Sequence, residues 1–347
     1  MVDGEVKASV IVCTHNRVDY LRECLASIAA QKCSEQFEVV VVDNGSTDGT
    51  SEALSGWCAR DPRFYTIRED RLGLSRAKNA GIAAARGAFL LFTDDDVIVE
   101  SHWIQTYVDF FSNKPHGPFA AGGVIIPVPS DLGAWPAWFD ENALCNVGLL
   151  DYKEQRRLES WEYLWGANMA LPRSVFLQFG GWEESVGRRG EERGTFEDVE
   201  IQDRIRSGGG SSWFCPGAIV KHRIDRRMIT PRRVVSKAFA RGRNECLQKT
   251  VLAGQAASGR RRQGVSICAM GLLMWFLLWI SWTVAFRVFK NGRNFERSRY
   301  AASSCGWWMC QLQSLVGSGS LSLEVGRLIF ATRGVVLCLT PEYLPEH

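Results

Sequence analysis

The sequence of 347 residues contains 11 cysteines but no CxxC pair and no cysteine–histidine run at zinc-ligand spacing. Scattered cysteines of this kind predict reduced thiols in a cytosolic protein, and they argue against a disulfide scaffold or a zinc module. A large excess of one charge is also missing, because the formal net charge is only +3. Bulk charge therefore gives no reason to expect nucleic acid as a partner.

Signals for secretion and for glycine-rich nucleotide sites are missing as well. The first apolar run, at residues 8–13, is short and polar residues follow it directly, so we expect no signal peptide. The sequence contains no GxGxxG and no GxxxxGKS/T, which argues against a dinucleotide fingerprint and a P-loop. We expect any nucleotide to be held by side chains at the carboxyl edge of a sheet.

The most informative stretch is residues 88–96, where an apolar run leads into Asp94, Asp95 and Asp96. A short apolar run bounded by polar residues predicts a buried parallel strand. Like charges ~4 Å apart repel by roughly 4 kcal/mol at an effective dielectric of 20, and a divalent cation relieves that repulsion. Ligands of open α/β sheets bind beyond the carboxyl ends of strands, so we predict a metal there. Taken alone, the acidic cluster also fits a solvated turn or a helix N-cap.

Apolar runs and helical patterns alternate through the first half of the chain. Leu21, Leu25 and Ile28, for example, recur at helical spacing after the first run. We expect strands at residues 8–13, 37–42, 64–67 and 119–126, and helices at residues 75–86 and 103–111. Such alternation predicts an α/β fold with a parallel sheet and helices on both faces.

Polar motifs follow these elements. Val-Cys-Thr-His-Asn-Arg stands at residues 12–17, Val-Val-Asp-Asn-Gly-Ser-Thr-Asp-Gly at 41–49, and Ser-Arg-Ala-Lys-Asn-Ala-Gly at 75–81. Together with the aspartates at 94–96, which fit a DxD motif, they resemble the family 2 glycosyltransferases of GT-A fold. The resemblance covers roughly residues 6–225 and rests on four motifs in the right order and spacing.

The resemblance implies a Rossmann-like mixed sheet flanked by helices, a nucleotide-sugar donor, a Mg²⁺ or Mn²⁺ ion, and inversion at the anomeric carbon. UDP is the default nucleotide. It implies a donor site formed by Thr14, Asn16, Asp43, Arg76, Asp94 and Asp95, with Asp96 on the metal. Asp43 also fits an Asx-turn aspartate, and Arg76 also fits a solvated helix cation.

Glu197 and Asp198 open another predicted helix. Carboxylates in a first turn are favoured by the helix dipole and cap its end, which is the structural interpretation. The resemblance implies instead that Asp198 deprotonates the acceptor hydroxyl and that Glu197 supports it. His222 follows a strand-like segment; it is either structural or, as the resemblance implies, a further metal ligand.

The acceptor site is expected around Trp165, Gly166 and Asn168. Gly166 lacks a side chain, so backbone there can approach a ligand closely. The tryptophans of this region either line an acceptor groove or belong to the core; they are Trp135, Trp138, Trp161 and Trp165. A Gln-x-x-Arg-Trp motif, which polymerising members of the family carry, is absent, and this favours a single transfer.

The last third of the chain is basic and hydrophobic, and we divide the protein into a catalytic domain at residues 1–228 and a helical, membrane-associated region at 229–347. Residues 265–286 carry no charge and, as a helix, would be about 33 Å long. This segment either spans a bilayer, lies in its interface, or is a buried core helix. A membrane-embedded or in-plane hairpin is favoured over a clean span, because Trp275, Trp279 and Trp282 would share one helix face and tryptophan prefers the headgroup level.

These observations predict a metal-dependent, inverting glycosyltransferase, of the hexosyl-transferring type, at the cytoplasmic face of the cell membrane. The acceptor would be a saccharide or a polyprenyl-linked sugar in cell-surface polysaccharide or glycolipid synthesis. The alternative is a membrane-attached module that binds nucleotide sugars without turnover. A nucleotidyltransferase would need a glycine- and lysine-rich first loop, which Thr14-His15-Asn16-Arg17 is not.

Overall fold

The computed structural model describes residues 5–114, 119–130, 133–136, 139, 144, 147–184, 197–225 and 229–230. The chain divides into two units, residues 1–128 with 148–223 and residues 129–147 with 224–347, and most described residues belong to the first. The predicted boundary after residue 228 stays a prediction. Residues 265–286 lie outside the described part; within that part, no helix combines the length and apolar character needed to cross a bilayer.

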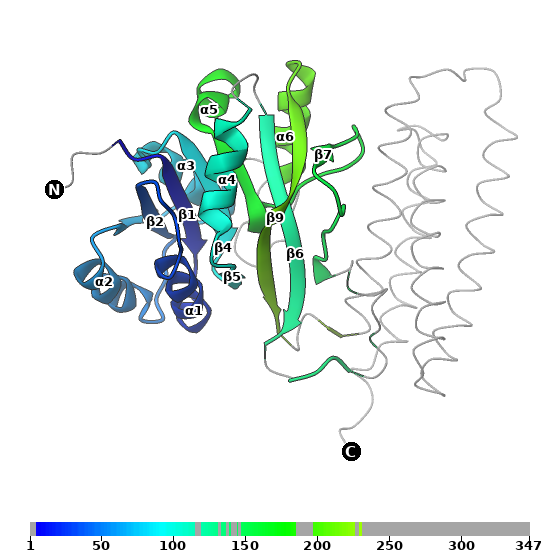
Figure 1. Ribbon diagram of the computed structural model, residues 1–347. Helices are drawn as coiled ribbons and strands as arrows, with labels where there is room; N and C mark the ends of the chain where they lie inside the picture. Colours follow the sequence, from blue (N-terminus) through cyan, green and yellow to red (C-terminus); the bar gives the residue numbers. More distant parts are fainter. Residues whose placement is uncertain are drawn as a thin grey trace, which may run out of the picture. The chain divides into compact units, whose positions relative to one another are not determined.

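One half of the sheet is parallel, as predicted. Its strands are β1 (Ala8–Thr14), β2 (Phe37–Asp43), β3 (Phe64–Arg68) and β4 (Phe89–Asp94), in the spatial order β3-β2-β1-β4. The register pairs Thr14 with Asp43 and Cys13 with Asp94. The carboxyl ends of these strands, which carry the polar motifs, therefore meet at one edge of the sheet (Figure 1).

The other half of the sheet is antiparallel, which makes the sheet mixed. Next to β4 come β8 (Met169–Pro172), β6 (Phe119–Pro129), β9 (Ser211–Ile224) and β5 (Val97–Val99), and β7 (Arg156–Arg157) pairs with β9. The strand-like segment expected before His222 is part of the strand β9.

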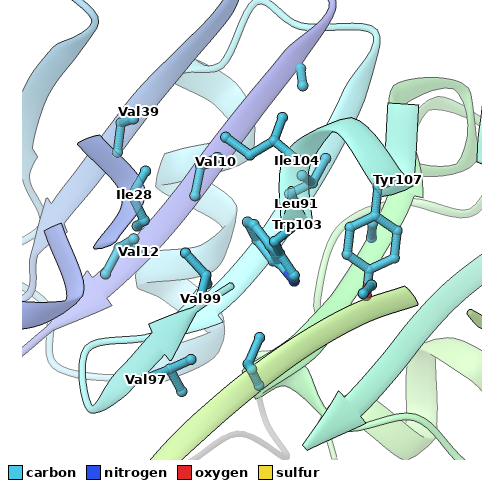
Figure 2. Packing of buried hydrophobic residues seen from close by; sticks show 14 of the residues in the cluster. Val10, Val12, Ile28, Val39, Leu91, Val97, Val99, Trp103, Ile104 and Tyr107 are labelled. Atoms are coloured by element: carbon cyan, nitrogen blue, oxygen red, sulfur yellow. The ribbon is translucent and has the colours of Figure 1, made fainter. Parts of the chain in front are cut away.

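Helices cover both faces of the sheet. One apolar cluster takes in α1 (Val18–Ala29), α2 (Thr50–Arg60) and α4 (Trp103–Ser112), and the other takes in α3 (Leu74–Ala84), α5 (Arg173–Phe179) and α6 (Glu197–Ser207). Successive residues of β1 alternate between them: Val10 and Val12 join the first cluster and Ile11 the second. Figure 2 shows the first cluster, in which Trp103 and Tyr107 of α4 pack beside the sheet.

Asn168 joins four segments of the core. Its Oδ1 accepts hydrogen bonds from Trp103 Nε1 (2.7 Å) and the Tyr107 hydroxyl (2.8 Å), and its Nδ2 donates to the carbonyls of Val124 (2.9 Å) and Ala218 (2.8 Å). The residue is 0% exposed. This corrects the expectation that Asn168 faces the acceptor, because its amide is fully engaged inside the protein.

Candidate active site

A first group of charges lies at the ends of β1 and β4. Arg17 donates from Nη1 to Asp95 Oδ1 and from Nη2 to Asp96 Oδ2, each at 2.7 Å. Thr14 donates its hydroxyl to the other oxygen of Asp95 at 2.8 Å. The loop after β1 is thereby tied to the acidic motif, as the shared sheet edge predicts. Arg17 lies in a quoted motif but is missing from the predicted site residues.

The pKa values of the two acids held by Arg17 shift in opposite directions. Burial raises the pKa of Asp95 to about 7; Arg17 opposes this, and Asp96 adds to it. Burial also acts against ionisation of Asp96, but His222 and Arg17 outweigh it and hold the pKa of Asp96 below its usual range. Asp96 is therefore a carboxylate at neutral pH, which is the form that binds a cation.

Asp96 and His222 together fit a divalent ion. Asp96 Oδ1 is buried without a hydrogen-bond partner among the described residues, and His222 Nε2 lies 3.5 Å from it. The pairing of β5 with β9 brings them together, because His222 faces Val97, the residue after Asp96. Within the described ranges, no three acidic, histidine or cysteine side chains are grouped as a metal cage. Mg²⁺ and Mn²⁺ accept few protein ligands when substrate oxygens complete the shell, so the donor atoms of this pair fit such an ion, and metal binding here stays a prediction.

Asp43 is buried at the end of β2 and holds its own loop. Oδ1 accepts from the Ser46 N–H at 2.8 Å, and Oδ2 accepts from the Ser51 hydroxyl at 2.9 Å and from Arg68 Nη1 at 3.2 Å. Burial opposes ionisation, but the hydrogen bonds of Ser46 and Ser51 outweigh it and lower the pKa of Asp43. These are the contacts of the Asx-turn interpretation, and the nucleotide role of Asp43 stays a prediction.

Asn16 and Arg76 also make contacts within the protein. Asn16 has a φ of 52°, and its Oδ1 accepts from the Thr47 N–H at 2.7 Å, which links the loops after β1 and β2. Arg76 Nε donates to Glu184 at 2.9 Å. Both residues therefore shape the edge of the sheet, and their contacts to a nucleotide stay predictions.

A second group of charges surrounds Asp198 at the start of α6. Lys78 of α3 donates from Nζ to Asp198 Oδ1 at 2.9 Å and lies 3.7 Å from Glu197 Oε1. The Gly166 N–H donates to Asp198 Oδ2 at 2.7 Å. A Cβ at Gly166 would lie 2.8 Å from both of these oxygens and from Lys78 Nζ, so glycine is needed for this close approach.

The buried charges of this second group depend on one another. Burial disfavours the Lys78 ammonium, but Asp198 and Glu197 outweigh it and raise the pKa of Lys78. Burial raises the pKa of Glu197, and Lys78 opposes that shift. Sequence reasoning missed Lys78, although a signal was present: Ser75, Lys78 and Gly81 share one buried stripe of α3, where a cation needs a buried partner.

Asp94 lies within the field of both groups. Burial and Asp96 raise the pKa of Asp94, Lys78 and His222 lower it, and Asp198 raises it further. The end of β4 therefore lies close to both groups, and Thr93, the residue before Asp94, donates its hydroxyl to the Ala167 carbonyl at 2.9 Å, next to Gly166. This brings residues more than 100 positions apart in sequence to one edge of the sheet.

The tryptophans predicted either as groove or as core have different placements. Trp161 is 60% and Trp165 44% exposed, so these two belong to the surface. Trp165 directly precedes Gly166, which contacts Asp198, whereas its other neighbour Leu164 is fully buried. Trp135 stacks on Phe139 with ring centroids 5.0 Å apart. Trp138 lies outside the described residues.

Residues 9–176, just under half of the chain, match the family model described as "Glycosyl transferase family 2". In solved structures, a similar chain is that of GalNAc-T7 with UDP, GalNAc and Mn²⁺, at a TM-score of 0.51 and 19% identity, covering 69% of this chain and 48% of that one. This likeness supports the fold alone. A mixed α/β sheet flanked by helices, of GT-A type, is thereby confirmed.

Among curated proteins, the glucosyl-dolichyl phosphate glucuronosyltransferase of Haloferax volcanii is 28% identical over 202 residues, 58% of this chain and 63% of its own length. The validoxylamine A glucosyltransferase of Streptomyces hygroscopicus subsp. jinggangensis is 27% identical over 224 residues, 58% of this chain and 51% of its own length. The chain thus spans less than two thirds of these relatives.

Proposed function

We propose that the whole chain transfers a sugar from a nucleotide diphosphate to an acceptor hydroxyl, with inversion at the anomeric carbon, because residues 9–176 match the family model of the family 2 glycosyltransferases. The relatives support this, since both are sugar transferases by name. A donor with UDP or another nucleotide follows from the same family match.

One observation carries the proposal: two charged groups of different chemistry meet at the end of β4, where Thr93 donates its hydroxyl to the Ala167 carbonyl at 2.9 Å, next to Gly166. On one side, Asp96 and His222 form a cation site. On the other side, Asp198 is a carboxylate with fixed partners. A reaction that separates charge between a leaving diphosphate and an attacking hydroxyl needs both kinds of group, on either side of the sugar.

The cation site suits the leaving group. We propose that Asp96 and His222 hold Mg²⁺ or Mn²⁺, which supplies, when bound, the positive charge that stabilises a departing nucleoside diphosphate. Arg17 pairs with Asp95 and Asp96 and neutralises part of their charge. Thr14 fixes the second oxygen of Asp95.

The proton chemistry belongs to Asp198. In the proposed transfer, its carboxylate accepts the proton of the acceptor hydroxyl while the acceptor oxygen bonds to the anomeric carbon. The bond from that carbon to the diphosphate breaks with its electron pair, which leaves the sugar inverted. Glu197 contributes to the buried charge balance around Lys78. General-base assistance such as that of Asp198 is worth about 10²- to 10⁴-fold in rate.

The acceptor is proposed to be a saccharide, free or polyprenyl-linked, stacked on Trp165. The exposure of Trp165, whose chain neighbour Gly166 contacts Asp198, supports the placement, because the C–H face of a sugar packs on an aromatic ring. The dolichyl phosphate in the name of the Haloferax relative supports a lipid-linked acceptor. Attachment to the cytoplasmic face of a membrane through residues 229–347 is part of the same proposal.

The test is a thermal-shift screen of nucleoside diphosphates and their sugars with Mn²⁺, followed by transfer assays with saccharide and polyprenyl-linked acceptors. We expect one donor class to stabilise the protein only with a divalent ion, and EDTA or Asp96→Asn to abolish that stabilisation. Binding without turnover across the acceptor panel would support the non-catalytic module instead. Full activity of Asp96→Asn in EDTA would overturn the metal assignment.

A further inference from the structure

Lys78 is a cation enclosed by protein. Its side chain is 4% exposed, and its Nζ contacts Asp198 and Glu197 and lies 4.3 Å from the centroid of the Trp182 ring. A buried ammonium is unfavourable unless carboxylates or an aromatic face replace its water. All of these replacements come from other segments than α3, so Lys78 joins α3 to α6 and to the segment around Trp182.

The surroundings of Lys78 are themselves fixed. Asn79, the next residue, donates from Nδ2 to the Trp182 carbonyl at 2.9 Å and accepts from the Trp182 N–H at 2.7 Å. A Cβ at Gly181 would lie 2.4 Å from Asn79 Oδ1, so that pairing needs glycine there. The Trp182 ring is thereby held against the Lys78 ammonium.

The carboxylate of Asp198 receives one donor on each oxygen, from Lys78 on Oδ1 and from the Gly166 N–H on Oδ2. Gln202, one turn further along α6, fixes the segment before Gly166, since its side chain pairs with the N–H and the carbonyl of Leu164, each at 3.0 Å. Each carboxylate oxygen has a second lone pair, which stays available for a proton. The orientation of the carboxylate is therefore set by two elements that lie outside α6.

We infer that Lys78 is a positioning residue for the general base: it holds the Asp198 carboxylate in the orientation that receives the proton of the acceptor. This inference rests on the proposed function. Lys78 keeps its own proton throughout, because the proton of the acceptor hydroxyl goes to Asp198 and the electron pair of the broken bond goes to the diphosphate. Lys78 acts through Asp198 and touches neither donor nor acceptor.

The test compares Lys78→Gln, Lys78→Arg, Asp198→Asn and the double variant Lys78→Gln/Asp198→Asn in the full chain, by kcat, by KM for donor and acceptor, and by calorimetric donor affinity. We expect Lys78→Gln to lower kcat about 10- to 100-fold with donor affinity within about twofold of wild type. Lys78→Arg should recover part of the loss. In the Asp198→Asn background, Lys78→Gln should change kcat by less than about threefold, because residues that act as a unit are not additive.

Lys153→Gln is the matched control, because Lys153 also pairs with an aspartate, Asp151, but is 80% exposed; its kinetic constants should equal those of wild type. If Lys78→Gln does not fold, the same cycle is run with Lys78→Arg, Asp198→Asn and the double variant Lys78→Arg/Asp198→Asn, in which the loss caused by Lys78→Arg should again disappear. Three outcomes would overturn the inference and leave the proposed function intact. They are a wild-type kcat in Lys78→Gln, a loss of donor affinity in that variant as large as its loss of kcat, and full additivity of Lys78→Gln with Asp198→Asn. If the wild-type protein neither transfers a sugar nor hydrolyses the donor, the proposed function itself is overturned.

Discussion

Two cation–carboxylate groups lie near the end of β4, and they differ in solvent access. The Arg17 side chain is 36% exposed and bridges Asp95 and Asp96 with two nitrogens, whereas the Lys78 side chain is 4% exposed and contacts Asp198 at a single atom. A guanidinium fork reads the direction of carboxylates, while an ammonium is a compact point charge. Arg17 therefore fixes two carboxylates with its two nitrogens, whereas Lys78 fixes one oxygen of Asp198 and balances the charge of a buried carboxylate.

The difference in solvent access indicates which group adapts to a ligand. The partly exposed Arg17 guanidinium leaves its partners at small cost, because water replaces its lost contacts and a bound cation would balance the buried Asp95 and Asp96 in its place. A buried pair does not, since removing one partner leaves a charge without solvent. We expect the Arg17 group to rearrange when a metal and a diphosphate arrive at Asp96, and the Lys78 group to keep its contacts through the reaction.

The largest expected effect tests whether the two groups are separable. Asp198→Asn keeps the shape of the side chain but removes the proton acceptor, so kcat should fall about 10²- to 10⁴-fold. Donor affinity should stay within about twofold of wild type, because Asp96 and His222 are untouched. Transfer kinetics and calorimetry with the donor diphosphate and Mn²⁺ measure both quantities. A large loss of donor affinity would mean that the two groups form one unit.

A smaller effect tests how closely the buried group is packed. In Gly166→Ala the new methyl group meets both Asp198 oxygens and Lys78 Nζ at 2.8 Å, so Asp198 or the backbone of residue 166 must move. We expect a loss of about 1 to 3 kcal/mol in the free energy of unfolding and a fall in kcat of at least about 10-fold. Urea unfolding and transfer kinetics provide the measurements.

Gly56→Ala is the control for that substitution. Gly56 lies within α2, and a Cβ there meets no atom within 4 Å among the described residues. The substitution should stabilise the protein by about 0.5 to 1 kcal/mol, since alanine loses less conformational freedom in a helix, and it should leave kcat unchanged. Equal kinetics for the two alanine variants would contradict the close packing around Asp198.

The parallel strands and their meeting point could be predicted from the sequence because the signal is local. β-branched residues define β1 and β2, each strand ends in a polar residue, and parallel strands place such ends at one edge. The contact of Thr14 with Asp95 follows from that rule. Asp96 and His222 are likewise together, although their pairing depends on the register of β5 against β9.

The buried group could not be predicted in the same way because its members come from separate elements. Lys78 and Asp198 are 120 residues apart, and their contact depends on how α3 and α6 pack over the sheet. The role of Asn168 depends on the packing of α4, β6 and β9 around one amide. The one local signal is the helical spacing that places Lys78 on the same face of α3 as Ser75 and Gly81.

The smallest expected effect extends the comparison to the acceptor. If the acceptor sugar stacks on Trp165, it reaches the reaction from the side of the buried group, next to Gly166 and Asp198. Trp165→Ala should then raise the acceptor KM about 5- to 10-fold, which corresponds to about 1 to 1.4 kcal/mol. The donor KM should stay the same, because Trp165 is not part of the Arg17 group. Initial rates with each substrate varied in turn measure both constants.

Leu177→Ala is the matched control for Trp165→Ala, because Leu177 is also an exposed apolar side chain, at 82% exposure, but belongs to α5. Its removal should change neither KM. A rise in donor KM in Trp165→Ala would instead mean that this indole contacts the nucleotide sugar. The acceptor would then have to approach Asp198 from another direction. The Arg17 group could no longer be assigned to the donor alone, nor the Lys78 group to the acceptor alone.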